Sequence, residues 1–214
     1  MGMTSMRTRR RLVDRLRSDG IRSEQVLSAI QATPRHMFVD QALAHKAYED
    51  TALPIGQNQT ISQPHVVALM TELLMAANIP MRKVLEVGTG CGYQTAILSQ
   101  LVKWVFTIER IGSLQQQARA RLPELGYRNI SYLNADGFVG WESNQPFDGI
   151  LVAAAPAELP RKLLDQLAVG GRMVIPVGAG SRQQLRIVTR TATGFEEELS
   201  AGVRFVPMLN GHKS

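Results

Sequence analysis

The glycine-rich segment EVGTGCGYQT (residues 86–95) constrains the fold more than any other part of the sequence. It overlaps the end of a short apolar run, KVLEV (83–87), and leads into a segment with helical spacing, YQTAILSQL (93–101). Glycines at a strand-to-helix junction let the backbone turn tightly and approach a ligand, and the helix N-terminus adds partial positive charge. The segment therefore predicts the first strand, turn and helix of a ligand-binding α/β domain.

Short apolar runs and helical patterns continue to alternate after this turn. Strand-like runs occupy residues 105–109, 130–134, 147–153 and 172–177, and helical patterns occupy residues 113–122 and 159–167. From about residue 184 the chain contains extended segments, at 185–191, 194–200 and 203–208, which indicate an antiparallel edge. The alternation is typical of parallel sheets. The expected fold class is therefore α/β, with a doubly wound, mostly parallel sheet and antiparallel C-terminal strands.

The chain before the glycine-rich segment has a different pattern. Residues 7–17 carry six arginines around a narrow apolar stripe of Leu12, Val13 and Leu16, which predicts a surface helix. Residues 22–45 predict short helices broken at Pro34, and residues 46–63 predict a loop. The residues after Pro64 have the spacing of a helix with one buried face.

Charge and composition exclude several function classes. The net charge of +6 is compatible with a nucleic-acid partner, but much of the excess lies in residues 7–17, which favours a solvated helix face over an RNA-binding arm. The single cysteine excludes an internal disulfide framework and a cysteine-cluster metal site. No apolar run is long enough to span a bilayer, and residues 1–20 lack the apolar middle of a signal peptide. We expect a cytoplasmic monomer with no bound metal and no nucleic-acid or membrane partner.

The spacing of the glycines separates two classes of nucleotide cofactor. A dinucleotide fingerprint, G-x-G-x-x-G, requires a third glycine at the position of Tyr93. The pattern here is G-x-G-x-G, and Glu109 ends the next strand 21 positions after Gly88, near the spacing at which an acid meets a ribose diol. Glu109, and Asp136 within NADGF (134–138), have the alternative interpretation of solvated strand ends. Their register with the glycine turn favours ligand binding.

The glycine pattern resembles motif I of the S-adenosylmethionine-dependent methyltransferases. This resemblance implies a Rossmann-like sheet, S-adenosyl-L-methionine as cofactor and S-adenosyl-L-homocysteine as its product. It also implies that Glu109 binds the ribose hydroxyls and that Asp136 faces the adenine amino group. Cys91 has a plainer interpretation as a small residue near a helix start. The candidate cofactor-binding residues are Glu86, Gly88, Thr89, Gly90, Cys91, Gly92, Glu109, Asp136 and Gly137.

A longer resemblance covers nearly the whole chain from about residue 10. The segment AYEDTALPIGQNQTISQPHVVALMTELL (47–74), with VLEVGTGCGYQTAIL, LNADGF, FDGILVAAA and VRFVP, resembles the protein-L-isoaspartate (D-aspartate) O-methyltransferase family. The resemblance implies a protein-repair enzyme that methylates the free carboxylate of L-isoaspartyl residues in damaged proteins and peptides. We expect an N-terminal helical segment with a substrate loop (residues 1–78) and a cofactor-binding α/β core with C-terminal strands (residues 79–214), within one compact domain.

The polar segment NQTISQP (58–64) suits such an acceptor. A carboxylate is already anionic at pH 7, so it needs orientation toward the methyl donor rather than a general base. Thr60 and Ser62 share one side of an extended segment because side chains alternate, and Ser62 matches the family's active-site serine. Ser62 has the alternative role of N-cap for the helix near Pro64, and His65 is interpreted as a helix-start residue. The candidate substrate-binding residues are Ile55, Gly56, Gln57, Thr60, Ile61 and Val206.

Two other functions compete with this interpretation. The net positive charge suggests an RNA or DNA methyltransferase as one alternative. Against methylation of a base amine, the segment AAAP (153–156) offers no polar group to accept the amine. Against methylation of a pyrimidine carbon, which needs a cysteine nucleophile, the one cysteine lies inside the cofactor loop. A basic binding module with a cofactor-fold core is the non-enzymatic alternative. The glycine turn, with Glu109 and Asp136 in register, disfavours that module.

Overall fold

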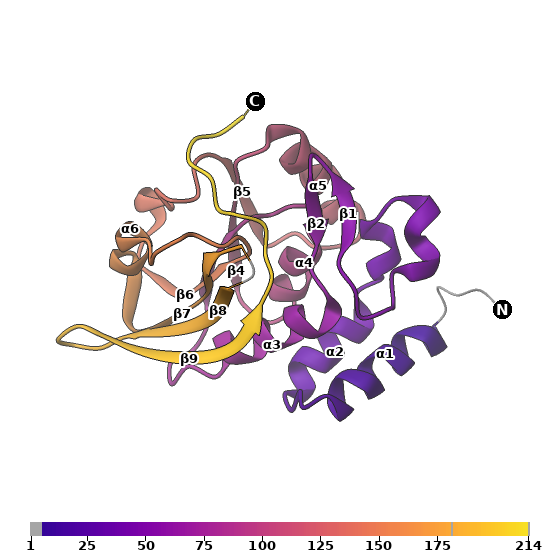
Figure 1. Cartoon of the computed structure of the whole chain (residues 1–214), viewed down its shortest axis with the longest axis horizontal. Coiled ribbons are helices and arrows are strands. Elements are labelled where there is room, and N and C mark those ends of the chain that lie inside the picture. Colours follow the sequence, from indigo (N-terminus) through magenta and orange to yellow (C-terminus); the bar gives the residue numbers. More distant parts are fainter. Residues whose placement is uncertain (1–5, 181, 214) are drawn as a thin grey trace.

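A seven-stranded sheet forms the centre of the molecule (Figure 1). The computed structural model describes residues 6–180 and 182–213. The sheet order is β5-β4-β3-β6-β7-β8-β9, in which β3 to β7 are parallel while β8 and β9 are antiparallel additions. The expected fold class is confirmed. The strands are β3 (Lys83–Val87), β4 (Trp104–Glu109), β5 (Ile130–Asn134), β6 (Phe147–Val152), β7 (Leu167–Ala179), β8 (Arg182–Arg190) and β9 (Phe195–Val203).

Strand β3 lies where the strand order reverses, between β4 and β6. Its residues Val84 and Leu85 are both fully buried, and they belong to different core clusters. A strand covered on both faces has a continuous apolar sequence, which explains the run KVLEV. β3 and β4 pair in register as far as Val87 and Ile108, so the glycine turn and Glu109 leave the sheet at the same edge. Ligands of open α/β sheets bind at such a position.

Helices cover both faces of the sheet. They are α3 (Pro64–Met75), α4 (Tyr93–Ser99), α5 (Gly112–Glu124) and α6 (Arg161–Asp165). On one face, Leu74 of α3 and Leu98 of α4 share a buried cluster with Val84 of β3. On the other face, Leu163 of α6 is buried in a cluster with Phe147 of β6. The sheet is therefore the middle layer of an α/β sandwich.

The N-terminal helices pack against α4 and α5 through one shared core. They are α1 (Met6–Ser18) and α2 (Glu24–Ala32), followed by the short 3-10 helices η1 (Arg35–Phe38) and η2 (Gln41–Lys46). Leu12, Val13 and Leu16 are buried, as the apolar stripe predicts. They belong to the same cluster as Ile97 of α4 and Leu122 of α5. The division near residue 78 stays a prediction, and the packing is continuous across it.

The loop expected over residues 46–63 contains a β-hairpin. β1 (Leu53–Gly56) pairs antiparallel with β2 (Gln59–Ile61), and Gln57 and Asn58 connect them with φ angles of 52° and 56°. Two consecutive positive φ angles are the signature of a type I′ turn, which suits two-residue hairpins. The expectation of a loop is wrong for residues 53–61, because Pro54, Gly56 and the polar side chains obscure two very short strands.

The C-terminal part also differs from the expectation. Residues 203–208 are predicted to be a strand, but β9 ends at Val203. The chain then crosses the carboxyl ends of the strands toward the C-terminus (Figure 1). Among the described residues it makes two isolated bridges there, between Pro207 and Ala155 and between Lys213 and Ile111. β7 begins at Leu167, before the expected position 172, because two adjacent glycines, at positions 170 and 171, interrupt its apolar pattern.

Candidate active site

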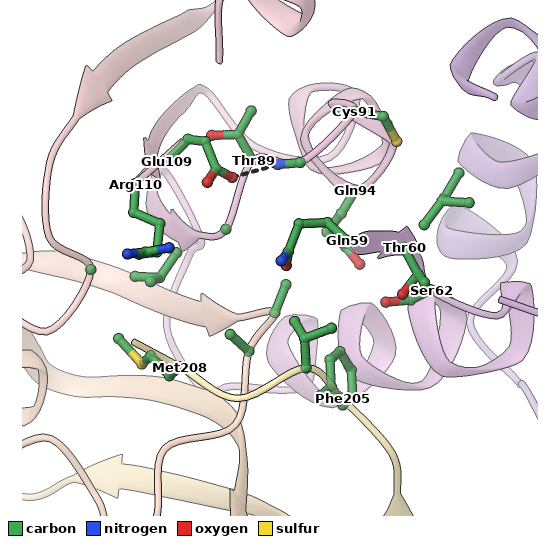
Figure 2. A pocket seen from close by; sticks show the side chains of 18 of the residues that line it. Gln59, Thr60, Ser62, Thr89, Cys91, Gln94, Glu109, Arg110, Phe205 and Met208 are labelled. Carbon is green, nitrogen blue, oxygen red and sulfur yellow. Dashed lines mark hydrogen bonds between the residues drawn. The ribbon is translucent and has the colours of Figure 1, made fainter. Parts of the chain in front are cut away.

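A pocket lies at the carboxyl edge of the sheet, between the glycine turn, the β1–β2 hairpin and the segment after β9 (Figure 2). It has a volume of about 1010 Å³, including the part open to solvent. Figure 2 shows Glu109 and Arg110 at one end of the pocket and Thr60 and Ser62 at the other, with Gln59 between them. Widely separated parts of the sequence therefore contribute to one site.

The glycine turn uses its three glycines in two ways. Gly88, Gly90 and Gly92 have φ angles of 101°, 52° and 89°, which glycine adopts without strain. Gly88 and Gly90 line the pocket. Gly92 faces away from it, because a Cβ on Gly92 would lie 3.0 Å from Leu122 Cδ1. The first two glycines thus expose backbone to a ligand, and the third allows α4 to pack against α5.

The carboxylate of Glu109 is held beside this turn. Gly90 donates its N–H to Glu109 Oε2 at 2.9 Å, and Ile111 donates its N–H to Oε1 at 2.9 Å. Burial raises the pKa of Glu109, and the N–H of Gly90 opposes that change. Each carboxylate oxygen can accept a further hydrogen bond. Glu109 is therefore oriented to receive hydroxyl groups of a ligand.

Glu86 lies beneath the turn, fully buried and outside the residues that line the pocket. Thr95 and Thr107 donate their hydroxyls to Glu86 Oε2 at 2.5 and 2.7 Å. The Thr107 hydroxyl also hydrogen-bonds the Thr89 hydroxyl at 2.6 Å. Burial raises the pKa of Glu86 to about 8, so the side chain is protonated at neutral pH. The geometry gives Glu86 a supporting position under Thr89 of the turn.

The hairpin and the start of α3 bring two hydroxyls into the pocket. Thr60 and Ser62 both line it, with their hydroxyls on the same side of the chain (Figure 2). The alternative role of Ser62 as N-cap is wrong, because the N-cap residue of α3 is Gln63. The backbone N–H of His65 is instead capped by Asp50 Oδ1 at 2.9 Å. His65 is a helix-start residue, as expected.

The segment after β9 forms another wall of the pocket and is anchored at several points. Gln183 Nε2 donates to the Phe205 carbonyl at 3.0 Å, and the Phe205 N–H donates to Gln183 Oε1 at 2.6 Å. The N–H of Ala155 donates to the Val206 carbonyl at 2.9 Å. These bonds position Phe205 and Val206 in the pocket wall.

Asp136 lies outside the residues that line the pocket. Its Oδ1 accepts the N–H of Phe138 at 2.9 Å, and its Oδ2 accepts the N–H of Gly211 at 2.7 Å. The neighbouring Gly137 does line the pocket, and a Cβ on Gly137 would lie 2.5 Å from Val87 Cγ1. In this structure the Asp136 carboxylate holds the C-terminal tail, and its contact with adenine stays a prediction.

Most of the candidate residues come together in this pocket. Those that line it are Ile55, Thr60, Ile61, Ser62, Gly88, Thr89, Gly90, Cys91, Glu109, Gly137 and Val206. Besides Glu86 and Asp136, three candidates lie outside it, namely Gly56, Gln57 and Gly92. Gly56 and Gln57 belong to the turn end of the hairpin, which the expected loop did not anticipate.

Sequence reasoning missed four residues of the pocket that carry polar groups, namely Gln59, Tyr93, Gln94 and Arg110. Gln59 directly precedes Thr60 in the polar segment NQTISQP (58–64). That position is the sequence signal that could have identified Gln59 as a pocket residue. Arg110 directly follows Glu109 and donates to the Gly211 carbonyl at 3.3 Å. No local pattern indicates that bond, because its partner lies near the C-terminus.

Other reactive groups offer no competing site. Burial raises the pKa of the Cys91 thiol, which keeps it protonated and supports its plainer interpretation. Among residues 6–180 and 182–213, no three His, Cys, Asp or Glu side chains are grouped to hold a metal ion. In the same part of the chain, every helix is too short or too polar to cross a membrane.

Comparisons with known proteins agree with this site. The profile of the protein-L-isoaspartate(D-aspartate) O-methyltransferase family matches residues 7–213. A protein-L-isoaspartate O-methyltransferase of Pseudomonas paraeruginosa is 59% identical over 98% of this chain and 99% of the relative, and one of Pseudomonas aeruginosa PAO1 is 58% identical over the same shares.

A solved structure is similar over most of its length. It is described as a protein-L-isoaspartate O-methyltransferase from Plasmodium falciparum in complex with S-adenosyl-L-homocysteine, with a TM-score of 0.81 and 25% identity over 92% of this chain and 96% of that one. A second structure, also of a protein-L-isoaspartate O-methyltransferase, has a TM-score of 0.83 and 26% identity over 93% of this chain and 65% of that one. The profile match and the close relatives show that this chain belongs to the protein-L-isoaspartate (D-aspartate) O-methyltransferase family.

Proposed function

We propose that this protein transfers the methyl group of S-adenosylmethionine to the free α-carboxylate of L-isoaspartyl residues in damaged proteins and peptides. Membership of the family supports the reaction, and the pocket supports the roles of individual residues. Glu109 and the glycine turn hold the cofactor, while Ser62 and Thr60 orient the acceptor. The observation that carries the proposal is that one pocket joins the Glu109 carboxylate to the hydroxyls of Thr60 and Ser62.

The residues at the turn fit an adenosine-bearing cofactor. A Cβ on Gly90 would lie 3.3 Å from Ile55 Cδ1, so the turn leaves little space for a side chain there. The Glu109 carboxylate, oriented by two backbone N–H groups, can accept the ribose hydroxyls. Asp136 and Gly137 are proposed to border the adenine. When bound, S-adenosylmethionine supplies an electrophilic methyl group on a sulfonium.

No side chain at the acceptor end is suited to remove a proton from an amine or an alcohol. Among the described residues that line the pocket, the ionisable side chains are Cys91, Tyr93, Glu109 and Arg110. Burial raises the pKa of Tyr93 to about 12, and Glu109 lies at the opposite end (Figure 2). A carboxylate acceptor needs no base, since it is ionised at pH 7. The pocket therefore favours carboxyl methylation over methylation of a nucleobase amine.

The apolar side chains around the two hydroxyls favour the reaction. Ile55, Ile61 and Val206 line the same pocket as Thr60 and Ser62. A carboxylate and a sulfonium become a neutral ester and a neutral thioether, so opposite charges cancel as the methyl group moves. Water-poor surroundings favour that loss of charge when binding offsets the desolvation of the anion. The hydroxyls donate hydrogen bonds without adding a counter-charge that would weaken the nucleophile.

Methyl transfer to a matched pair of peptides tests this function. One peptide carries an L-isoaspartyl residue, whose main chain passes through the side-chain carbon, and its twin carries normal aspartate. Radiolabelled methyl should pass to the isoaspartyl peptide and only very poorly to the twin. Comparable kcat/KM values for the two peptides would overturn the proposed substrate class.

Ser62→Ala tests the proposed role of the Ser62 hydroxyl. Loss of one orienting hydrogen bond should lower kcat by roughly 10²–10³-fold, or about 3–4 kcal/mol in the barrier, and leave S-adenosylhomocysteine affinity nearly unchanged. Ser143→Ala is a matched control, because Ser143 is exposed and does not line the pocket. Full activity of Ser62→Ala would remove Ser62 from the mechanism. A methylated Ser62 detected by mass spectrometry would contradict direct transfer.

We also propose that the protein works as a cytoplasmic monomer without a nucleic-acid partner. Part of the basic charge of α1 is used within the chain, because Arg9 donates to the Ala32 carbonyl and Arg17 pairs with Glu24. The single, buried cysteine forms no disulfide framework. Light scattering of the purified protein tests whether it is a monomer. Titration with RNA and DNA at physiological salt tests whether it binds nucleic acid. A stable dimer, or tight binding of either nucleic acid, would contradict the proposal.

A further inference from the structure

A buried guanidinium lies behind the acceptor end of the pocket. Arg35, in η1, has 0% of its surface exposed and is not among the pocket residues. Its Nη2 donates to the Ser62 carbonyl at 2.8 Å and to the Thr51 carbonyl at 3.3 Å. Its Nε donates to the Ala47 carbonyl at 2.8 Å. Thr51 precedes β1 and Ser62 follows β2, so one side chain ties together the two ends of the hairpin.

Packing alone does not account for an arginine at this position. The ion pairs among the described residues do not include Arg35, and its Nη1 has no hydrogen-bond partner there. The guanidinium lies over the Tyr93 ring, 4.8 Å from the centroid. Burial lowers the pKa of Arg35, because the charged form is removed from water. Burying a charge without a carboxylate partner opposes folding, so an apolar side chain would serve the core better.

We propose that Arg35 is a positioning residue for the transfer reaction, which acts by holding the Ser62 carbonyl. A serine hydroxyl lies one bond beyond Cβ, so the backbone position of Ser62 largely determines where the hydroxyl lies. The helix that follows is anchored separately, by Asp50 on the N–H of His65. Arg35 therefore supplies the restraint on the hairpin side of Ser62. The inference rests on the proposed role of Ser62 in orienting the acceptor.

Arg35→Met and Arg35→Lys test the inference. Arg35→Met removes all three hydrogen bonds, and it should lower kcat roughly 10- to 100-fold, as expected for a displaced orienting group. Arg35→Lys keeps the charge but replaces the planar fork by one ammonium, so its kcat should lie between those of Arg35→Met and the wild type. S-adenosylhomocysteine affinity, measured by calorimetry, should stay within about threefold of the wild type and shows that each variant is folded.

A double-mutant cycle with Ser62→Ala separates positioning from a structural role. If Arg35 acts through Ser62, adding Arg35→Met to Ser62→Ala should lower kcat by less than about threefold more. Arg190→Met is the matched control, because Arg190 Nη1 donates to the carbonyls of Asp165 and Leu167, away from the pocket. That control should lower the melting temperature and change kcat by less than about twofold in either background.

The outcomes distinguish the inference from the proposed function. Full activity of Ser62→Ala would contradict the proposed role of Ser62. An impaired Ser62→Ala whose effect multiplies in full with that of Arg35→Met would refute only the inference about Arg35. If Arg35→Met does not fold, the same cycle with Arg35→Lys decides the question, and wild-type kcat in Arg35→Lys would overturn the inference.

Discussion

Replacing Glu86 by glutamine tests the physical state of the carboxyl beneath the glycine turn. Glu86 is fully buried, and burial raises its pKa from an ordinary value of 4.5 to about 8. Glutamine has nearly the same shape, carries no charge, and keeps a carbonyl oxygen for the hydroxyls of Thr95 and Thr107. The substitution therefore removes the titration and retains the hydrogen bonds.

The sign and size of the effect follow from proton linkage. The folded protein keeps a proton on Glu86 that the unfolded chain releases above pH 4.5, so folding binds a proton between these pH values. The stability that this proton provides is complete below about pH 4.5 and is lost as the pH rises to about 8. Between pH 5 and pH 8 the loss amounts to on the order of 3 kcal/mol, at about 1.36 kcal/mol per pKa unit.

Urea unfolding of the wild type and Glu86→Gln at pH 5, 6, 7 and 8 measures this loss. The contributions of the other titrating groups cancel when the unfolding free energy of the wild type is subtracted from that of Glu86→Gln. This difference should grow in favour of Glu86→Gln as the pH rises. Near pH 5 the two proteins should be almost equally stable. Unfolding free energies that run parallel across this range would refute the reasoning, because Glu86 would then titrate alike in the folded and unfolded chains.

Two further predictions concern the cofactor end and the start of α3. Glu109→Ala should weaken S-adenosylhomocysteine binding by roughly 1–3 kcal/mol, because a charge-assisted contact to the ribose is lost; unchanged affinity in calorimetry would remove Glu109 from the cofactor site. Asp50→Ala should lower the free energy of unfolding by about 1 kcal/mol, because the N–H of His65 loses its cap, whereas Asp50→Asn keeps an acceptor and should lose less. Equal stability of both Asp50 variants would contradict the capping role.

The sheet could be predicted from the sequence because its central strands have a local signature. The expected bounds of β3 and β5 agree with the structure, and the glycine turn and Glu109 lie at the same edge, as the spacing predicts. These strands are short apolar runs between turn residues, and helices cover both faces of β3. Glycine spacing also has a local cause, since Gly88 and Gly90 adopt positive φ angles that other residues rarely adopt.

The rest of the site depends on contacts between residues far apart in the sequence. Ser62 has the local signature of an N-cap, but the capping oxygen belongs to Asp50. The strand expected over residues 203–208 is instead a segment anchored by Gln183, whose amide bonds both backbone groups of Phe205. Here a side-chain amide makes the hydrogen bonds that the backbone of a neighbouring strand would otherwise make. Such a contact leaves no periodic pattern in the sequence. Such partners can be identified only once the fold brings them together.

Two buried ionisable residues, Glu86 and Arg35, lie behind opposite ends of the pocket. Each acts on a pocket residue indirectly, through one hydrogen-bonding group that lies between them. Glu86 acts on Thr89 through the Thr107 hydroxyl, and Arg35 acts on Ser62 through a carbonyl. Each leaves one polar atom without a partner among the described residues, Glu86 Oε1 and Arg35 Nη1, which costs stability. Selection for stability alone would favour side chains that cannot ionise at both positions. Stability and turnover should therefore separate: Glu86→Gln keeps the bonds that place Thr89 and should keep turnover, whereas Arg35→Met releases Ser62 and should lose it.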